Sequence, residues 1–480
     1  MKEKRNSEKE KKVVSEEGFE AKKPFNIKDT IIALKNNDNF VIVLEILIIL
    51  ALVVALVFII NGQKNNGGSN IGGNQGGIIG GGDSGNLDDD NSGGNTSEKN
   101  TCPECGERIR KVWDEFHHII DKETLMPADR GYLSVSVICK DSGMGDGLST
   151  ALFCMDLEEA LAFVNSLDGV EAMFVTEDEV KHYSNGFKNY IYTQGGSQGG
   201  SNTQKQSYKA YNFNYFDTIS TIIGYEATEA EFAATSNEAL ELLGEYHKLF
   251  DIYNEYDGMV NLYNLNQIVD GQHPKLKVDR KIIDMLLYAK EMYTLTGGRM
   301  NVAMGSVLSI WHDYRDAGSE QPAYAELPPM SDLQNAAKHT DINSIVIDEV
   351  NSTVWISDPY AKLDVGAIAK GYAVEKVAEM LKGKGKTDYT LNIGGNIRTI
   401  GTKASGDKWV TGIENPNDTS VYIEYIQLAG EAIVTSGSYQ RYYKVIVGAK
   451  CSKCSWIYDQ NLGIPSQNVA PGTLPKDLKY

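Results

Sequence analysis

Hydrophobic positions are spread unevenly along the chain and divide it into three kinds of segment. Residues 39–61 are almost uniformly apolar, residues 62–100 are dominated by Gly, Asn, Ser and Asp, and the remainder mixes apolar and polar positions. An apolar run of this length is typical of a helix that spans a bilayer once. The polar segment has too few large apolar side chains to form a core, so we expect a flexible tether there.

The charges on either side of the apolar run indicate its orientation. Lysines and Arg5 cluster before it, whereas only Lys64 follows it closely. Because basic residues favour the cytoplasmic side, residues 1–38 are expected in the cytoplasm and the soluble region outside. A cleaved signal peptide is the alternative, but no small-residue cleavage site ends the run. The sequence therefore predicts a single-pass protein anchored in the cell membrane by one N-terminal transmembrane helix.

Periodic patterns in the soluble region predict both helices and strands. Residues 216–225 alternate as a strand does, whereas residues 229–251 have helical periodicity behind a capping box formed by Thr228 and Glu231. Residues 277–295 predict a second helix that two glycines stop. Farther on, the segment 364–372 leads into a helix ending near residue 383, and a short strand at 389–393 follows. This mixture predicts an α+β fold.

Composition narrows the classes of partner. The 480 residues carry a net charge of −19, and 41% of them are hydrophobic. The hydrophobic fraction is sufficient for a core. The negative charge argues against a nucleic-acid partner, because phosphates would be repelled.

Six short motifs carry the candidate chemistry. They are Gly298-Arg-Met-Asn-Val-Ala-Met-Gly305 followed by Ile310-Trp311, Leu363-Asp-Val-Gly-Ala-Ile-Ala-Lys370-Gly-Tyr372, Leu391-Asn392-Ile-Gly394-Gly395-Asn396, Val434-Thr435-Ser436-Gly437, His118-Ile-Ile-Asp121 and Asp146-Gly-Leu-Ser-Thr150-Ala. Together they resemble the motifs of the ApbE-type FAD:protein FMN transferases. Lys122 stands where that family has proline, a difference that loosens a turn and removes no functional group.

The resemblance implies a mixed-sheet fold, FAD as substrate, Mg²⁺, and an acceptor flavoprotein whose threonine receives FMN. It also implies that Asp146, Thr150 and the backbone carbonyl of Ala369 hold the Mg²⁺, since a hard cation prefers oxygen ligands. His118 and Asp121 are the candidates for taking the proton of the acceptor hydroxyl, and Lys370 for catalysis at a phosphate. The residues that the resemblance implies in cofactor binding are Met300, Asn301, Asp364, Lys370, Asn392, Gly394, Gly395, Thr435, Ser436 and Gly437.

The order of the motifs indicates a circular permutation. The His118 and Asp146 motifs come first here, although the family places them last. A second resemblance is divided in the same way. Cys451-Ser-Lys-Cys454, with Tyr458-Asp459 and Val469-Ala-Pro-Gly-Thr473, resembles the first half of a rubredoxin, and Thr101-Cys102-Pro-Glu-Cys105-Gly106 resembles the second. Reading Tyr480 on into Thr101 restores a nearly complete rubredoxin.

This interpretation divides the chain into eight segments. They are a cytoplasmic tail (1–38), a transmembrane helix (39–61), a tether (62–100), the C-terminal half of the rubredoxin-like module (101–110), the C-terminal part of the transferase domain (111–193), a linker (194–207), the N-terminal part of the transferase domain (208–445) and the N-terminal half of the rubredoxin-like module (446–480).

The two Cys-x-x-Cys pairs predict one tetrahedral metal site, a small metal knuckle built from Cys102, Cys105, Cys451 and Cys454. Iron is favoured, because the resemblance extends beyond the ligands. Zinc suits the same four sulfurs, and disulfides or redox-active dithiols remain alternatives. The two other cysteines, Cys139 and Cys154, are predicted to be buried packing residues.

The leading hypothesis is a membrane-anchored, Mg²⁺-dependent FAD:protein FMN transferase with a rubredoxin-like module. One alternative is an extracytoplasmic electron-transfer protein that holds FAD without transferring it, next to a rubredoxin iron and with redox partners. Another is a flavin-binding protein or FAD pyrophosphatase without an acceptor. The joint presence of His118, Asp146 and Lys370 favours the enzyme.

Overall fold

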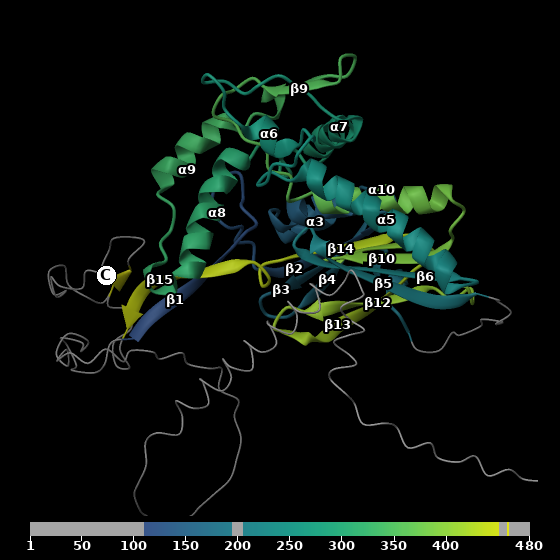
Figure 1. Cartoon of the computed structure of the whole chain (residues 1–480). Helices are drawn as coiled ribbons and strands as arrows, with labels where there is room; N and C mark the ends of the chain where they lie inside the picture. Colours follow the sequence, from purple (N-terminus) through teal and green to yellow (C-terminus); the bar gives the residue numbers. More distant parts are fainter. Residues whose placement is uncertain (1–109, 194–204, 451–457, 460–480) are drawn as a thin grey trace, which may run out of the picture. The chain divides into compact units, whose positions relative to one another are not determined.

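The computed structural model describes residues 110–193, 205–450 and 458–459 (Figure 1). Within these residues no helix combines the length and the apolarity needed to cross a membrane. The predicted transmembrane helix at 39–61, the tether and the four cysteines of the predicted metal site lie outside the described residues.

Helices and strands alternate along the described chain. The strands are β1 (Arg110–His117), β2 (Tyr132–Cys139), β3 (Glu171–Thr176), β4 (Lys181–Tyr183), β5 (Gln206–Tyr215), β6 (Thr218–Glu226), β7 (Leu276–Lys277), β8 (Ile345–Asp348), β9 (Thr353–Ile356), β10 (Asp388–Ile393), β11 (Asn396–Gly401), β12 (Trp409–Asn415), β13 (Asp418–Leu428), β14 (Ala432–Gly437), β15 (Tyr442–Lys450) and β16 (Tyr458–Asp459). The α-helices are α3 (Ser142–Phe153), α4 (Leu157–Asn165), α5 (Glu229–Phe250), α6 (Leu262–Asn266), α7 (Arg280–Leu295), α8 (Gly305–Glu320), α9 (Met330–Ala336) and α10 (Ala369–Gly383). Four 3₁₀ turns complete the set, at Phe187–Tyr190, Pro322–Tyr324, Ala337–His339 and Ile342–Ser344.

An eight-stranded sheet in the order β4-β3-β2-β14-β11-β10-β6-β5 forms the centre of the fold. The helices α3, α5 and α10 cover one face, and the β12–β13 hairpin covers the other (Figure 1). The α+β class is confirmed. The strands of this sheet pair antiparallel throughout, however, and not in the mixed arrangement that we expected. The two faces of an antiparallel sheet need not be covered alike, so helices can cover one face and a β-hairpin the other.

Local signals account for several element boundaries. The Thr228 side chain accepts a hydrogen bond from the Glu231 N–H at 3.2 Å, so α5 begins where the capping pattern predicted. The second predicted helix, α7, begins at Arg280 and not at residue 277, because Leu276–Lys277 pairs with β9 as a short strand. Two glycines with positive φ, Gly297 and Gly298, end that helix as predicted.

Strands from the two ends of the described chain pair with each other. β1 runs antiparallel to β15, with Arg110 opposite Lys450, and β2 runs antiparallel to β14. β15 also pairs with β16, and the β1–β15 ribbon of this three-stranded sheet packs on α8 through Trp311, Tyr443 and Val445 (Figure 1). The segment boundaries expected at 110/111, 207/208 and 445/446 each fall inside a strand, because backbone pairing continues past them.

The helices α3 and α10 approach each other closely. A Cβ atom at Gly371 would lie 2.3 Å from the carbonyl oxygen of Ser142, so only glycine fits there. A buried ion pair supports the contact: Arg398 donates to both carboxylate oxygens of Glu375, at 2.6 and 3.0 Å. The same carboxylate accepts the Ser142 N–H at 2.9 Å, which anchors the N-terminus of α3 to α10.

Candidate functional site

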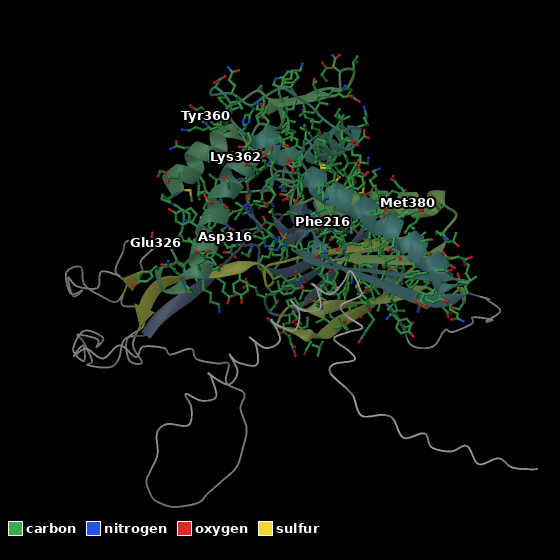
Figure 2. All side chains as sticks on the ribbon, viewed as in Figure 1. Phe216, Asp316, Glu326, Tyr360, Lys362 and Met380 are labelled. Atoms are coloured by element: carbon green, nitrogen blue, oxygen red, sulfur yellow. The ribbon has the colours of Figure 1, made fainter. Side chains whose placement is uncertain are left out.

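A cavity of about 830 Å³ lies where the β1–β15 ribbon, α8, α3, α10 and the turn between β5 and β6 meet. Phe216 and Asp316, both labelled in Figure 2, belong to its lining and come from the β5–β6 turn and from α8. Eleven of the predicted site residues line it. They are His118, Asp146, Thr150, Met300, Asn301, Asp364, Lys370, Gly394, Thr435, Ser436 and Gly437.

Asp146 and Thr150 lie one turn apart on α3, as predicted, and both line the cavity. The Asp146 side chain is buried, and its Oδ2 accepts the Gly371 N–H of α10 at 2.8 Å. Burial raises the pKa of Asp146, a shift that the positive charge of Lys370 opposes. A carboxylate in this position gains from a nearby cation.

Hydroxyl groups of β14 extend the polar wall beside α3. Ser436 Oγ lies 2.8 Å from Ser149 Oγ and 3.3 Å from Thr150 Oγ1. Thr435 Oγ1 lies 2.8 Å from Ser136 Oγ on the neighbouring strand β2. These contacts fix the oxygen atoms of β14 relative to Thr150, so the wall is organised before any ligand binds.

His118 follows β1 directly and stands at the rim of the cavity. Its Nδ1 lies 3.2 Å from the carbonyl oxygen of Arg441, across the base of the ribbon. Desolvation by the surrounding protein and the nearby Arg441 guanidinium lower the pKa of His118, although the residue as a whole is exposed. The imidazole is therefore neutral at pH 7 and able to accept a proton.

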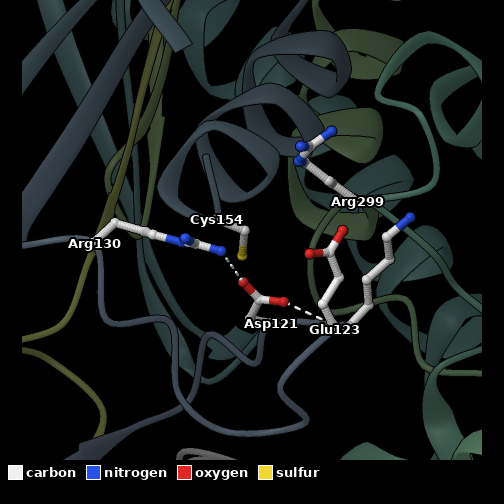
Figure 3. A pocket seen from close by; sticks show the side chains of 6 residues that line it. Asp121, Glu123, Arg130, Cys154 and Arg299 are labelled. Atoms are coloured by element: carbon white, nitrogen blue, oxygen red, sulfur yellow. Dashed lines mark hydrogen bonds and ion pairs between the residues drawn. The ribbon is translucent and has the colours of Figure 1, made fainter. Parts of the chain in front are cut away.

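Asp121 is placed differently from what the sequence predicted. It does not line the large cavity but a small neighbouring pocket, shown in Figure 3, together with Arg130 and Cys154. One carboxylate oxygen accepts from the Arg130 guanidinium at 2.8 Å, and the other accepts the Glu123 N–H at 2.7 Å. Both oxygens are thus engaged in holding the loop that follows His118, which fits a positioning role better than proton transfer.

The residues predicted to bind the cofactor divide into two groups. Gly394 lines the cavity with positive φ, and a Cβ atom there would lie 2.4 Å from Thr218 Oγ1. Asn392 and Gly395 are not among the lining residues, and neither is Ala369, whose backbone carbonyl was predicted to bind Mg²⁺. Asn392 instead accepts the Gly395 N–H at 3.0 Å and so holds the turn that presents Gly394.

Two further predicted residues, Met300 and Asn301, belong to the cavity lining but are held largely within the protein. The Asn301 side chain accepts the Ala303 N–H and donates to the Thr340 carbonyl, both at 2.9 Å, so its amide is occupied in fixing the loop before α8. Met300 is almost completely buried beneath that loop.

Cys139 and Cys154 are buried as predicted, and burial raises the pKa of each thiol to about 12.

Sequence reasoning missed several lining residues. They include Tyr253, Arg299, His312, Arg315 and Arg441. Four of them lie outside the six motifs. Arg299 lies within the first motif, directly before Met300, but the resemblance assigned it no role. His312 could have been found from the helical spacing that it shares with Met304 and Leu308, because residues four apart lie on one helix face.

The cavity lining has slightly more basic than acidic side chains, although the chain as a whole is acidic. Its acidic side chains are Asp146, Asp217, Asp316 and Asp364. Five Lys and Arg side chains line it, namely Lys122, Arg299, Arg315, Lys370 and Arg441. In the described part of the chain, neither Lys370 Nζ nor the Arg441 guanidinium has a side-chain hydrogen bond or ion pair. Unpaired cations inside a concave site favour an anionic ligand.

The comparisons with known proteins agree on one family. The sequence profile of the ApbE family matches residues 106–174 and 216–474. The FAD:protein FMN transferase of Klebsiella pneumoniae is 26% identical over 204 residues, which cover 41% of this chain and 60% of that protein. The enzyme of the same name from Vibrio cholerae is 29% identical over 193 residues, covering 40% of this chain and 54% of the relative.

Solved structures of the family are also similar to this chain. The ApbE protein of Thermotoga maritima is 25% identical, with 54% of this chain and 78% of that chain covered at a TM-score of 0.43. The flavin transferase ApbE of Vibrio cholerae is 23% identical, with the same coverage and a TM-score of 0.41. The chain spans 54–60% of the length of the two curated relatives described above. Because the family profile matches well over half of its residues, the chain belongs to the ApbE family.

Proposed function

We propose that this protein is a FAD:protein FMN transferase that splits FAD and joins FMN to a threonine of an acceptor flavoprotein. The observation that carries the proposal is the cavity that His118, Asp146 and Lys370 share. These residues come from the β1–β15 ribbon, α3 and α10, so tertiary packing alone brings them together. The names of the curated relatives support the same activity.

The size and charge of the cavity fit a dinucleotide. A volume of about 830 Å³ is in the upper part of the range of roughly 300–1,000 Å³ that small-molecule sites occupy. The unpaired Lys370 and Arg441 cations suit a pyrophosphate. Phosphoryl transfer depends mainly on such charge neutralisation and on in-line positioning.

The oxygen atoms near Asp146 fit a magnesium ion. Asp146 contributes a carboxylate and Thr150 a hydroxyl, and both line the cavity. The third proposed ligand is the backbone carbonyl of Ala369, which begins α10 and is not among the lining residues. Among the described residues no cluster of three or more His, Cys, Asp or Glu side chains could hold a metal. A site with one carboxylate suits Mg²⁺, which retains water and substrate phosphate oxygens. When bound, the ion would neutralise phosphate charge.

His118 is proposed as the general base. In the transfer step the acceptor hydroxyl oxygen forms a bond to the FMN phosphorus, and the bond from that phosphorus to the bridging oxygen breaks. AMP leaves with the bridging oxygen, and the hydroxyl proton moves to His118. His118 is unprotonated at pH 7, as a base must be before it acts, but a base is most effective when its pKa lies near the working pH, and the pKa of His118 is lowered to about 3. The proposed role therefore rests on the place of His118 in the cavity.

The decisive experiment incubates the full chain with FAD, Mg²⁺ and an acceptor flavoprotein. We expect the acceptor to gain the mass of a phosphoester-linked FMN and AMP to appear in equal amount. An acceptor whose target threonine is replaced by valine is the matched control. Tight FAD binding with no mass gain would instead support the electron-transfer alternative, and AMP release without acceptor labelling would support a pyrophosphatase.

We further propose that the domain is circularly permuted. The strand pairing supports this: β14, β15, β1 and β2 would follow one another along an unpermuted chain, and β15 pairs with β1 while β14 pairs with β2. Consecutive strands are neighbours in most folds. The linker predicted at 194–207 would then join the family's original ends.

The same pairing supports one metal site for the four cysteines. Cys451 follows Lys450, which lies opposite Arg110, and Cys105 precedes Arg110 by five residues. β15 also pairs with β16, so Cys451 and Cys454 fall within the connection between two antiparallel strands. The proposed site of four thiolates would suit iron or zinc. A membrane anchor at 39–61 is the last part of the proposal. Accessibility of the transferase domain to added protease in intact cells would test whether that domain lies outside the membrane.

A further inference from the structure

The helix α8 presents a row of side chains to the cavity. Leu308, His312 and Arg315 line it at intervals of four and three residues, so they share one face of the helix. Trp311 lies on the other side, where its indole N–H donates to the Leu125 carbonyl at 3.0 Å. This anchoring fixes the rotation of α8 and therefore the direction in which His312 points.

His312 is held by Tyr253, which also lines the cavity. The Tyr253 Oη lies 3.2 Å from His312 Nδ1. Burial, together with the charge of Asp364, raises the pKa of Tyr253 to about 12, so the phenol keeps its proton and can donate it to Nδ1. We therefore assign the proton of the neutral ring to Nε2, the nitrogen that faces Asp364.

Asp364 faces His312 Nε2, and hydrogen bonds fix its position. Its side chain is 8% exposed, Oδ1 accepts the Gly366 N–H at 2.9 Å, and its own N–H donates to the Val302 carbonyl at 2.9 Å. Oδ2 has no hydrogen-bond donor among the residues that the structure describes. It lies 3.8 Å from His312 Nε2, which is too far for a hydrogen bond.

A donor and an acceptor at this separation, both lining one cavity, suit a group that accepts from one and donates to the other. We propose that His312 Nε2 and Asp364 Oδ2 bind one hydroxyl group of the flavin nucleotide, with Tyr253 as a positioning residue. This inference rests on the proposed function. The hydroxyl belongs either to the ribityl chain or to the ribose of the adenosine, and both have the same chemistry.

Ligand affinities distinguish the two sources. In the full chain, His312→Leu removes the donor and His312→Gln keeps an N–H group. We expect His312→Leu to weaken FAD binding about 10- to 100-fold, because it leaves the oxygen of the ligand hydroxyl without its hydrogen-bond donor, and His312→Gln to restore part of the loss. A ribityl hydroxyl predicts that FMN loses the same factor while ADP is unaffected. A ribose hydroxyl predicts the reverse.

The matched control is His339→Leu. His339 forms a similar pair with Asp358, with Nδ1 and Oδ2 2.7 Å apart, but it does not line the cavity. This variant should bind all three nucleotides as the wild type does. Unchanged FAD affinity in folded His312→Leu, or an equal loss for FMN and ADP, would overturn the subsite. Failure of the wild-type chain to bind FAD would overturn the proposed function instead.

Discussion

The contact between α3 and α10 gives a sharp test of how the site is built, through the substitution Gly371→Ala. The added Cβ atom would lie 2.3 Å from the Ser142 carbonyl oxygen and 2.6 Å from Asp146 Cβ. Ordinary contact begins at 3.4 Å, so the two helices must separate by about 1 Å at this point. The obstacle is backbone, which cannot rotate away as a flexible side chain would.

The expected magnitude follows from two opposing terms. Overpacking of a close contact costs about 1–3 kcal/mol. Alanine recovers up to about 1 kcal/mol, because it is a better helix former than glycine. We therefore expect a net loss of about 1–2 kcal/mol in the free energy of unfolding. The separation also lengthens the 2.8 Å bond from Gly371 N–H to Asp146, which should weaken Mg²⁺ about tenfold.

Urea unfolding and a Mg²⁺ titration of transfer activity measure the two effects separately. Gly383→Ala is the matched control, because it lies on the same helix and a Cβ atom there meets nothing within 4 Å. That variant should be neutral or stabilised by up to about 1 kcal/mol. If both variants unfold at the same urea concentration and Gly371→Ala keeps the wild-type Mg²⁺ dependence, the close contact does not position Asp146.

The remaining predictions concern the catalytic groups and the cysteines. Asp146→Ala is expected to slow acceptor flavinylation at least about a hundredfold, because a ligand that positions the pyrophosphate is lost; a wild-type rate would exclude the metal role. His118→Asn should leave FAD affinity unchanged and lower kcat about 10²- to 10⁴-fold, whereas a change confined to FAD binding would contradict its role as base. Because burial and then Arg441 lower the pKa of His118, its ring stays neutral below the ordinary value of about 6.5. Transfer measured at pH 6 should accordingly proceed close to its pH 7 rate, and a loss centred at pH 6.5 would argue against this histidine. Anaerobically purified protein is expected to contain iron at the four cysteines, and stoichiometric zinc in elemental analysis would assign the module a structural role.

Local signals sufficed for the elements with strong caps and periodicity. The boundaries of α5 follow from Thr228 and its helix-forming run, and the strand β10 ends at the glycine pair that the sequence marked. The start of α7 was misplaced by three residues, because pairing of β7 with β9 is a tertiary contact that a local pattern does not reveal. Sheet order depends on such contacts throughout, so it was not predictable from periodicity.

The site shows the same division between local and tertiary information. Motif residues such as His118, Asp146 and Lys370 were identified, and the fold brings them to one cavity. Asp121 was assigned to proton transfer because it shares a motif with His118, but the Arg130 guanidinium draws its carboxylate into a separate pocket. His312 was missed because α8 becomes a cavity wall only when Trp311 packs against the loop after β1.

The β1–β15 ribbon explains how one fold can carry both proposed functions without interference. At one end of the ribbon, where His117 pairs with Tyr442, the neighbouring residues His118 and Arg441 line the cavity, and at the opposite end Arg110 pairs with Lys450. β1 has eight residues, which span about 26 Å at 3.3 Å per residue. The length of β1 therefore separates the Arg110–Lys450 pair from the cavity. For the same reason the order of the chain matters little: β1 and β15 are held by backbone pairing and by packing on α8, whichever of them comes first in the sequence.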